Sequence, residues 1–343
     1  MGRETEDLQA VKQASRNEPG QTGLGMTVED LLIHQQPRRN VQGIAAALLP
    51  YERDGRIAVD AFAERLASTH RAGLMNAVNM DTGYVNYLSD AEKLDVLAWT
   101  RQALGDGVPF VAGAYIENHS GDDIVALYRR EIDAIVRFDG IPILFQTAHL
   151  RGESPEKIAQ IYRDVVRGYS HVLVFELGSM FASNGEIYGL ETIRRLMDIP
   201  ELRGIKHSSL NRLAEIERLI LRDRHRPDFR IYTGNDLGIN MIEYGSDYLL
   251  GLAAFCPEKF AERDCLWKAG DPEYYALSDV LQHLGNVAFR APVPAYKHSA
   301  AVFLNLIGRI PSDRTHPSNP QRPAWESEIM TDCARRLCLV DLH

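Results

Sequence analysis

The chain has 343 residues, of which 45% are hydrophobic and 25% charged, as in a globular protein with a sizeable core. Its 47 acidic residues outnumber the 38 basic ones, for a formal net charge of -9. That balance disfavours a nucleic-acid partner, because such partners need a basic surface. No apolar run is long enough to span a bilayer and the N-terminal segment is polar, so we expect a cytoplasmic protein with no membrane partner.

Short apolar runs alternate with amphipathic stretches after a polar segment, residues 1–25, which we expect to be a flexible tail. Apolar strands separated by helices are typical of a parallel sheet. The strands are predicted at 43–50, 74–80, 109–116, 141–147, 171–177, 203–208, 229–234 and 247–254. The intervening helices are predicted at 59–72, 89–104, 122–138, 154–168, 190–198, 210–223 and 237–244.

This alternation predicts an α/β protein whose residues 26–270 form a closed (β/α)8 barrel. An open, doubly wound sheet is the alternative. Residues 271–343, with helices expected at 272–287, 297–306 and 324–337, are predicted to form a C-terminal helical region packed on the barrel. The four cysteines include no CxxC pair or Cys/His cluster, so neither a metal site nor a disulfide framework is predicted.

Lys206 stands at the end of an apolar strand, at the expected mouth of the barrel, where such folds place their catalytic groups. Loss of solvation in a crowded mouth lowers a lysine pKa, which provides the neutral amine that attacks a ketone. The position also suits a lysine whose stem packs at the strand end while its ammonium reaches solvent. The residue pattern by itself leaves both interpretations open.

The segment GIKHSSLNRL at 204–213 resembles the GIKxSS segment of the dihydrodipicolinate synthase / N-acetylneuraminate lyase family. The stretch DTG at 81–83 stands where that family has GTTGE. YTGND at 232–236 is similar to its SGDD strand end, and 245–253 is similar to its GAxG…SGLAN stretch. The resemblance covers roughly residues 43–337, with the motifs in the same order.

The family consists of (β/α)8 class I aldolases and dehydratases that are usually homotetramers. The resemblance therefore implies that Lys206 forms a Schiff base with a 2-keto acid, without a cofactor. It also implies that Thr82, together with the Gly83 backbone amide, holds the substrate carboxylate.

The chain departs from the family where protons are moved. The first threonine of GTTGE is Asp81, its glutamate is Tyr84, and the catalytic tyrosine falls on Phe175, which has no hydroxyl. Another acid or base is therefore needed, and Glu176, His149 and Tyr84 are the candidates. Strand alternation could instead turn Glu176 away from the lumen, and His149 could be an exposed loop residue.

The sequence thus predicts a Schiff-base-forming lyase, an aldolase or dehydratase, acting on a sugar-derived 2-keto acid. One alternative is a barrel that binds a sugar acid without imine chemistry. Another is a metal-dependent, enolate-forming lyase with Asp81, Glu117 and Glu176 as ligands. The expected partners are the keto acid and further copies of the chain. The residues expected to contact substrate are Asp81, Thr82, Gly83, Gln146, Phe175, Asn235 and Leu250.

Overall fold

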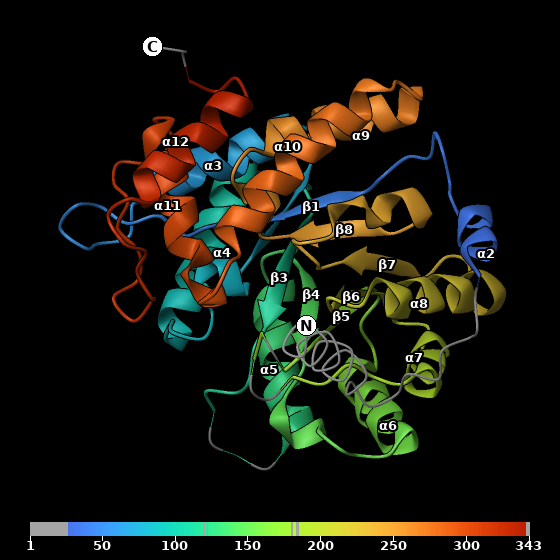
Figure 1. Ribbon diagram of the computed structural model, residues 1–343. Helices are drawn as coiled ribbons and strands as arrows, with labels where there is room; N and C mark the ends of the chain where they lie inside the picture. The colour runs from blue at the N-terminus through green and yellow to red at the C-terminus, as the bar shows by residue number, and fades with distance from the viewer. Residues whose placement is uncertain (1–26, 120, 122, 180, 183–184, 341–343) are drawn as a thin grey trace, which may run out of the picture.

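Eight parallel strands close into a barrel in the order β1 to β8, with β8 pairing back onto β1 (Figure 1). The computed structural model describes residues 27–119, 121, 123–179, 181–182 and 185–340, so the expected tail at 1–25 lies outside the described residues. The closed barrel confirms the predicted fold and excludes the open sheet. The strands are β1 Gly43–Ala46, β2 Met75–Val78, β3 Phe110–Ala114, β4 Ile141–Phe145, β5 Val172–Leu177, β6 Leu202–Ser208, β7 Arg230–Thr233 and β8 Asp247–Leu250.

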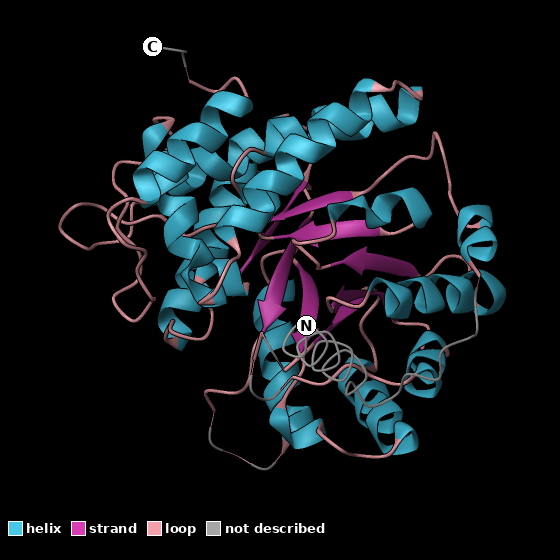
Figure 2. Cartoon of the chain, in the orientation of Figure 1, coloured by secondary structure: helices cyan, strands magenta, loops and turns pink. Residues whose placement is uncertain are grey.

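Helices surround the strands, as Figure 2 shows. Two of their starts follow directly from the sequence: Ser89 and Glu92 form a capping box, and Ser154 caps the helix that begins with Pro155. None of the described helices combines the length and apolar character needed to cross a membrane. The helices up to the last barrel unit are α2 Val28–Ile33, α3 Val59–Arg71, α4 Asp90–Leu104, α5 Ile124–Val136, α6 Pro155–Val166, α7 Leu190–Met197, α8 Arg212–His225 and α9 Pro257–Ala269.

Two predictions near the end of the barrel need correction. The helix expected at 237–244 is a 3₁₀ helix, Ile239–Tyr244, and α9 was not predicted at all. The inward face of α9 carries Arg263, which is fully buried among Phe260 and other core residues. A charged residue on the buried face hides the one-sided apolar pattern that identifies a helix.

Side chains on each strand alternate between the barrel interior and the layer of helices. On β5, Leu173 and Phe175 belong to the interior cluster, whereas Val174 belongs to the outer cluster. The register pairs Phe175 with Lys206 and Glu176 with His207. Lys206 therefore faces the interior, and its neighbour His207 faces the helices.

In the described part of the chain, three α-helices follow the barrel, and Figure 1 shows them together on one side of it. They confirm the predicted C-terminal helices, although the boundary expected at residue 270 stays a prediction. Between the first two, a short segment reaches the mouth of the barrel, where Val293 and Pro294 line the central cavity. The helices are α10 Glu273–Ala288, α11 Tyr296–Leu306 and α12 Glu326–Arg336.

Candidate active site

A cavity of about 290 Å³ lies at the C-terminal ends of the strands, where this fold places its catalytic groups. It is lined by strand ends, by loops and by the segment that joins α10 to α11. The polar side chains in its wall are Asp81, Thr82, Asn86, Gln146, Lys206, Ser208 and Asp236. The aromatic side chains are Tyr115, Phe145, Phe175, Phe181, Phe289 and Tyr296.

Lys206 projects into this cavity from β6 and is 9% exposed. Its Nζ lies 4.2 Å from the centre of the Phe175 ring. Burial lowers the Lys206 pKa to about 8, although the charges of Asp236 and Asp81 favour the ammonium. A substantial fraction of the amine is therefore neutral near physiological pH, as a nucleophile requires.

A glycine at the end of β7 makes room for the lysine. A Cβ atom at Gly234 would lie 2.7 Å from Lys206 Cε and 2.0 Å from Ser208 Oγ. Both contacts are closer than real Cβ atoms allow, so any side chain at this position would displace the Lys206 stem.

Asp236 shares the cavity with Lys206 and was not among the predicted site residues. Burial raises its pKa to about 7, although a 2.8 Å hydrogen bond from the Leu252 N–H and the charge of Lys206 oppose the shift. Asn235, which was predicted to contact substrate, is buried and accepts a hydrogen bond from the Leu237 N–H at 3.0 Å. It therefore holds the turn that presents Asp236.

A second polar group forms where the loop after β2 meets α11. Lys297 Nζ lies 2.9 Å from Asp81 Oδ1, and the Tyr296 hydroxyl donates to Asp81 Oδ2 at 2.9 Å. The same hydroxyl lies 2.9 Å from Thr82 Oγ1. Tyr296 is 5% exposed and Lys297 1%, so α11 closes this side of the cavity with the Tyr296 hydroxyl and holds the Lys297 ammonium against Asp81.

Asp81 is the most open member of this group, with 53% of its side-chain surface exposed. The surrounding protein atoms oppose its ionisation, but Lys297 and the hydrogen bond from Tyr296 outweigh them and lower the Asp81 pKa below its usual range. Its negative charge is thus balanced by Lys297, and it does not simply add a repulsive charge to the cavity.

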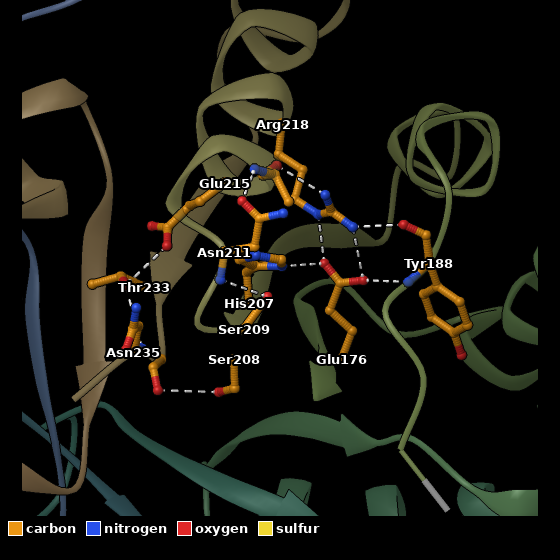
Figure 3. Close-up of polar contacts among 12 residues, drawn as sticks. Glu176, Tyr188, His207, Ser208, Ser209, Asn211, Glu215, Arg218, Thr233 and Asn235 are labelled. Atoms are coloured by element: carbon orange, nitrogen blue, oxygen red, sulfur yellow. Dashed lines mark hydrogen bonds and ion pairs between the residues drawn. The ribbon is translucent and has the colours of Figure 1, made fainter. Parts of the chain in front are cut away.

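Glu176 lies on the outer face of β5, and this placement corrects its expected role as the replacement acid or base (Figure 3). Its carboxylate is fully buried and accepts from Arg218 Nε at 2.6 Å, from His207 Nδ1 at 2.7 Å and from the Tyr188 N–H at 2.8 Å. Burial alone would raise its pKa, but Arg218 and His207 lower it to about 2. It is held as an anion away from the cavity.

Four further expectations are also not met by the placement of the side chains. His149 is exposed outside the cavity wall, and Tyr84 is buried behind it among the rings of Tyr51 and His316. The Gly83 N–H already donates to the Met80 carbonyl at 3.0 Å. Leu250 belongs to the outer core cluster, because alternation along β8 points it toward the helices.

The expected contacts that do reach the cavity wall are Asp81, Thr82, Gln146 and Phe175. Gln146 is 2% exposed and accepts a hydrogen bond from the Glu186 N–H at 2.9 Å. Together with Lys206, these residues come from strands far apart in the sequence, which the barrel brings to one mouth.

The carboxylates proposed for a metal-dependent enzyme are not gathered into one site. Within the described part of the chain, the group close enough to share an ion is Asp90, His119 and Glu131, none of which lines the cavity. Lys93 Nζ lies 2.9 Å from Asp90 and 3.1 Å from Glu131, so an ammonium already balances these acids. This arrangement gives the metal-dependent alternative no support.

The family described as "Protein of unknown function (DUF993)" matches residues 71–312, more than half of the chain. The chain belongs to the DUF993 family. It is also 22% identical, over 236 residues, to a 4-hydroxy-tetrahydrodipicolinate synthase of Kosmotoga olearia, covering 68% of this chain and 77% of that protein. This likeness confirms the resemblance predicted from the sequence, and the solved structures confirm the fold that it implied.

Among solved structures, this DUF993 protein is similar to YagE of E. coli K12, a protein of the dihydrodipicolinic acid synthase family in complex with pyruvate. The TM-score is 0.76 at 14% identity, over 88% of this chain and 99% of YagE. A dihydrodipicolinate synthase from Thermotoga maritima gives a TM-score of 0.73 at 15% identity, over 88% and 100%. One from Acinetobacter baumannii, complexed with pyruvate, gives 0.71 at 16% identity, over the same shares. At these identities the structures establish a shared fold.

Proposed function

We propose that this protein is a lyase of the class I aldolase or dehydratase type, which forms a Schiff base between Lys206 and a 2-keto acid. The observation that carries the proposal is the buried Lys206 in the barrel cavity, whose pKa is lowered to about 8. It stands at the lysine of the GIKxSS segment that the sequence resembles. A neutral amine is the group that adds to a ketone.

Asp236 is the proposed partner of Lys206 in forming the imine. The amine attacks the keto carbon, and the resulting carbinolamine must lose water, which requires a proton at the departing hydroxyl. A carboxyl group with a pKa of about 7 can both give and take a proton near neutral pH. Asp236 and Lys206 interact electrostatically in the same cavity, so the protonation of one influences the other.

The substrate class is a 2-keto acid, and pyruvate is the natural first probe because two of the similar structures contain it. A sugar-derived substrate, a homotetramer and a cytoplasmic location were implied by the sequence and stay predictions. The binding-only alternative differs from the proposal in one respect, since it forms no imine.

Reductive trapping tests the proposal. The folded protein is incubated with pyruvate and cyanoborohydride, and the adduct is located by intact mass and peptide mapping. We expect one adduct on Lys206, absent in Lys206→Ala and retained in Lys268→Ala, which removes an exposed lysine. Binding of pyruvate without any adduct would overturn the proposal and favour the binding-only alternative.

A further inference from the structure

The hydrogen bonds around Tyr296 have a direction that can be deduced from its one hydroxyl proton. Lys297 Nζ lies 2.9 Å from Asp81, which keeps that carboxylate ionised and able only to accept. Tyr296 therefore donates its proton to Asp81 Oδ2 at 2.9 Å. The 2.9 Å contact between Tyr296 and Thr82 must then be a bond donated by Thr82. The chain of donors runs from Thr82 through Tyr296 to Asp81.

Because Thr82 already donates its proton to Tyr296, its Oγ1 can only accept a further hydrogen bond. Thr82 lines the cavity, so that bond would come from a bound molecule. A hydroxyl whose proton is already donated can accept a proton from a bound molecule, but it cannot donate to a carboxylate. Thr82 is therefore poorly suited to the role of carboxylate anchor that the resemblance implied for it.

We propose that Thr82, Tyr296 and Asp81 form a proton relay that moves the proton next to the imine carbon, with Tyr296 of α11 as its central member. The inference rests on the proposed function, because the relay acts on a keto acid already bound to Lys206. It assigns to the C-terminal helical region a chemical role that Phe175 cannot fill, because Phe175 has no hydroxyl.

The step is balanced without any further reactant. In the iminium formed with pyruvate, a methyl C–H bond breaks and its electron pair forms the new C=C bond. The C=N electrons move onto Nζ of Lys206, which leaves a neutral enamine. The proton passes to Thr82 as the Thr82 proton passes to Tyr296 and the Tyr296 proton to Asp81, which ends neutral. The reverse sequence returns the proton to carbon.

The packing around Tyr296 fixes the geometry that such a relay needs. Its ring stacks on Phe289 at 4.2 Å between centroids, with an angle of 16° between the planes. Gly251 lies next to both rings, and a Cβ there would stand 3.1 Å from Thr82 Oγ1 and 3.2 Å from Tyr296 Cε2. The bare backbone after β8 therefore lets Thr82 and Tyr296 meet.

The test separates imine formation from proton transfer with pyruvate as the probe. Trapping on Lys206 reports the imine, and exchange of the pyruvate methyl protons in D₂O, followed by NMR, reports the enamine. In Tyr296→Phe we expect trapping within a few-fold of the parent protein and exchange slower by roughly 10²-fold or more. Asp81→Asn, which removes the final acceptor, should show the same split.

Tyr274→Phe is the matched control, because Tyr274 is also a buried tyrosine of the C-terminal region whose hydroxyl donates to a carboxylate, that of Glu243. Its exchange rate should match the parent protein. Parental exchange in both Tyr296→Phe and Asp81→Asn would overturn the relay alone. Loss of trapping in folded Tyr296→Phe would also overturn it, since Tyr296 would then serve imine formation. Absence of trapping in the parent protein would overturn the proposed function as well.

Discussion

Strands β5 and β6 carry polar groups on both faces, and the two faces differ in how completely those groups are paired. On the outer face, Glu176 receives bonds from Arg218, His207 and the backbone of Tyr188. On the inner face, Lys206 lies against the ring of Phe175 in an open cavity. Both faces bury charge, but only the inner one leaves its charge with few partners.

The pKa values of the buried groups on the outer face and in the cavity reflect this difference. The Glu176 carboxyl has a pKa of about 2 and stays ionised, whereas Lys206 and Asp236 have pKa values of about 8 and about 7. Groups that titrate near neutral pH inside a cavity are suited to chemistry, and groups locked in one state are suited to holding structure. The shift alone is not sufficient: burial also raises the Glu215 pKa to about 7, yet Glu215 does not line the cavity.

The largest expected effect is on the outer face. Glu176→Gln removes the negative charge beside Arg218, which is 2% exposed, and leaves a buried cation with weaker partners. We expect a loss of about 3–5 kcal/mol in the free energy of unfolding, measured by urea denaturation. Glu191→Gln breaks an exposed pair with Arg194, where solvent screens the charges, and should leave the free energy of unfolding almost unchanged. Equal losses in the two variants would remove the distinction between the faces.

The second largest effect is a gain in the free energy of unfolding, and it comes from a residue in the cavity. Asp236→Asn keeps an oxygen for the Leu252 N–H but cannot ionise. Because folding raises the Asp236 pKa from 3.8 to about 7, the parent protein loses stability as pH rises through this window. The variant should be more stable by about 1–3 kcal/mol at pH 8, and about equal at pH 4, in urea unfolding. A variant less stable at pH 8 would show that Asp236 is a structural residue.

Periodicity was sufficient for most of the fold, because most barrel strands are largely apolar and most outer helices have one apolar face. It failed at α9, where buried Arg263 interrupts the apolar face. It also failed for the 3₁₀ helix Ile239–Tyr244, since an apolar segment of that length does not reveal its hydrogen-bond pattern.

The site was only partly predictable, for a different reason. The role of Lys206 could be predicted from its position at a strand end and from the motif around it. Glu176 could have been set aside by alternation, because it is next to inward-facing Phe175. Tyr296 offered no such signal, since it lies beyond the eighth strand and meets Asp81 through the packing of α11 against the barrel mouth. Asp236 stood in the predicted YTGND strand end, one residue after the Asn235 that was chosen.

The smallest expected effect concerns the pH dependence of imine formation. Asp236 raises the pKa of Lys206, against the larger lowering by burial. Asp236→Asn removes that charge, so the neutral amine should appear at lower pH. We expect the initial rate of trapping with pyruvate, measured between about pH 6 and pH 9, to rise with pH as the amine becomes neutral. In the variant this rising limb of the pH–rate profile should move to lower pH by less than about one unit. Asp54→Asn, which changes an exposed carboxylate, should leave the limb unchanged.

The position of this limb can be interpreted separately from the rate itself. If Asp236 also gives or takes a proton during imine formation, the maximal rate falls, but the limb still follows the Lys206 pKa. A limb that stays in place would mean that Asp236 and Lys206 do not share an electrostatic environment. The cavity would then contain two independent groups, and its contrast with the tightly paired Glu176 on the outer face would depend on burial alone.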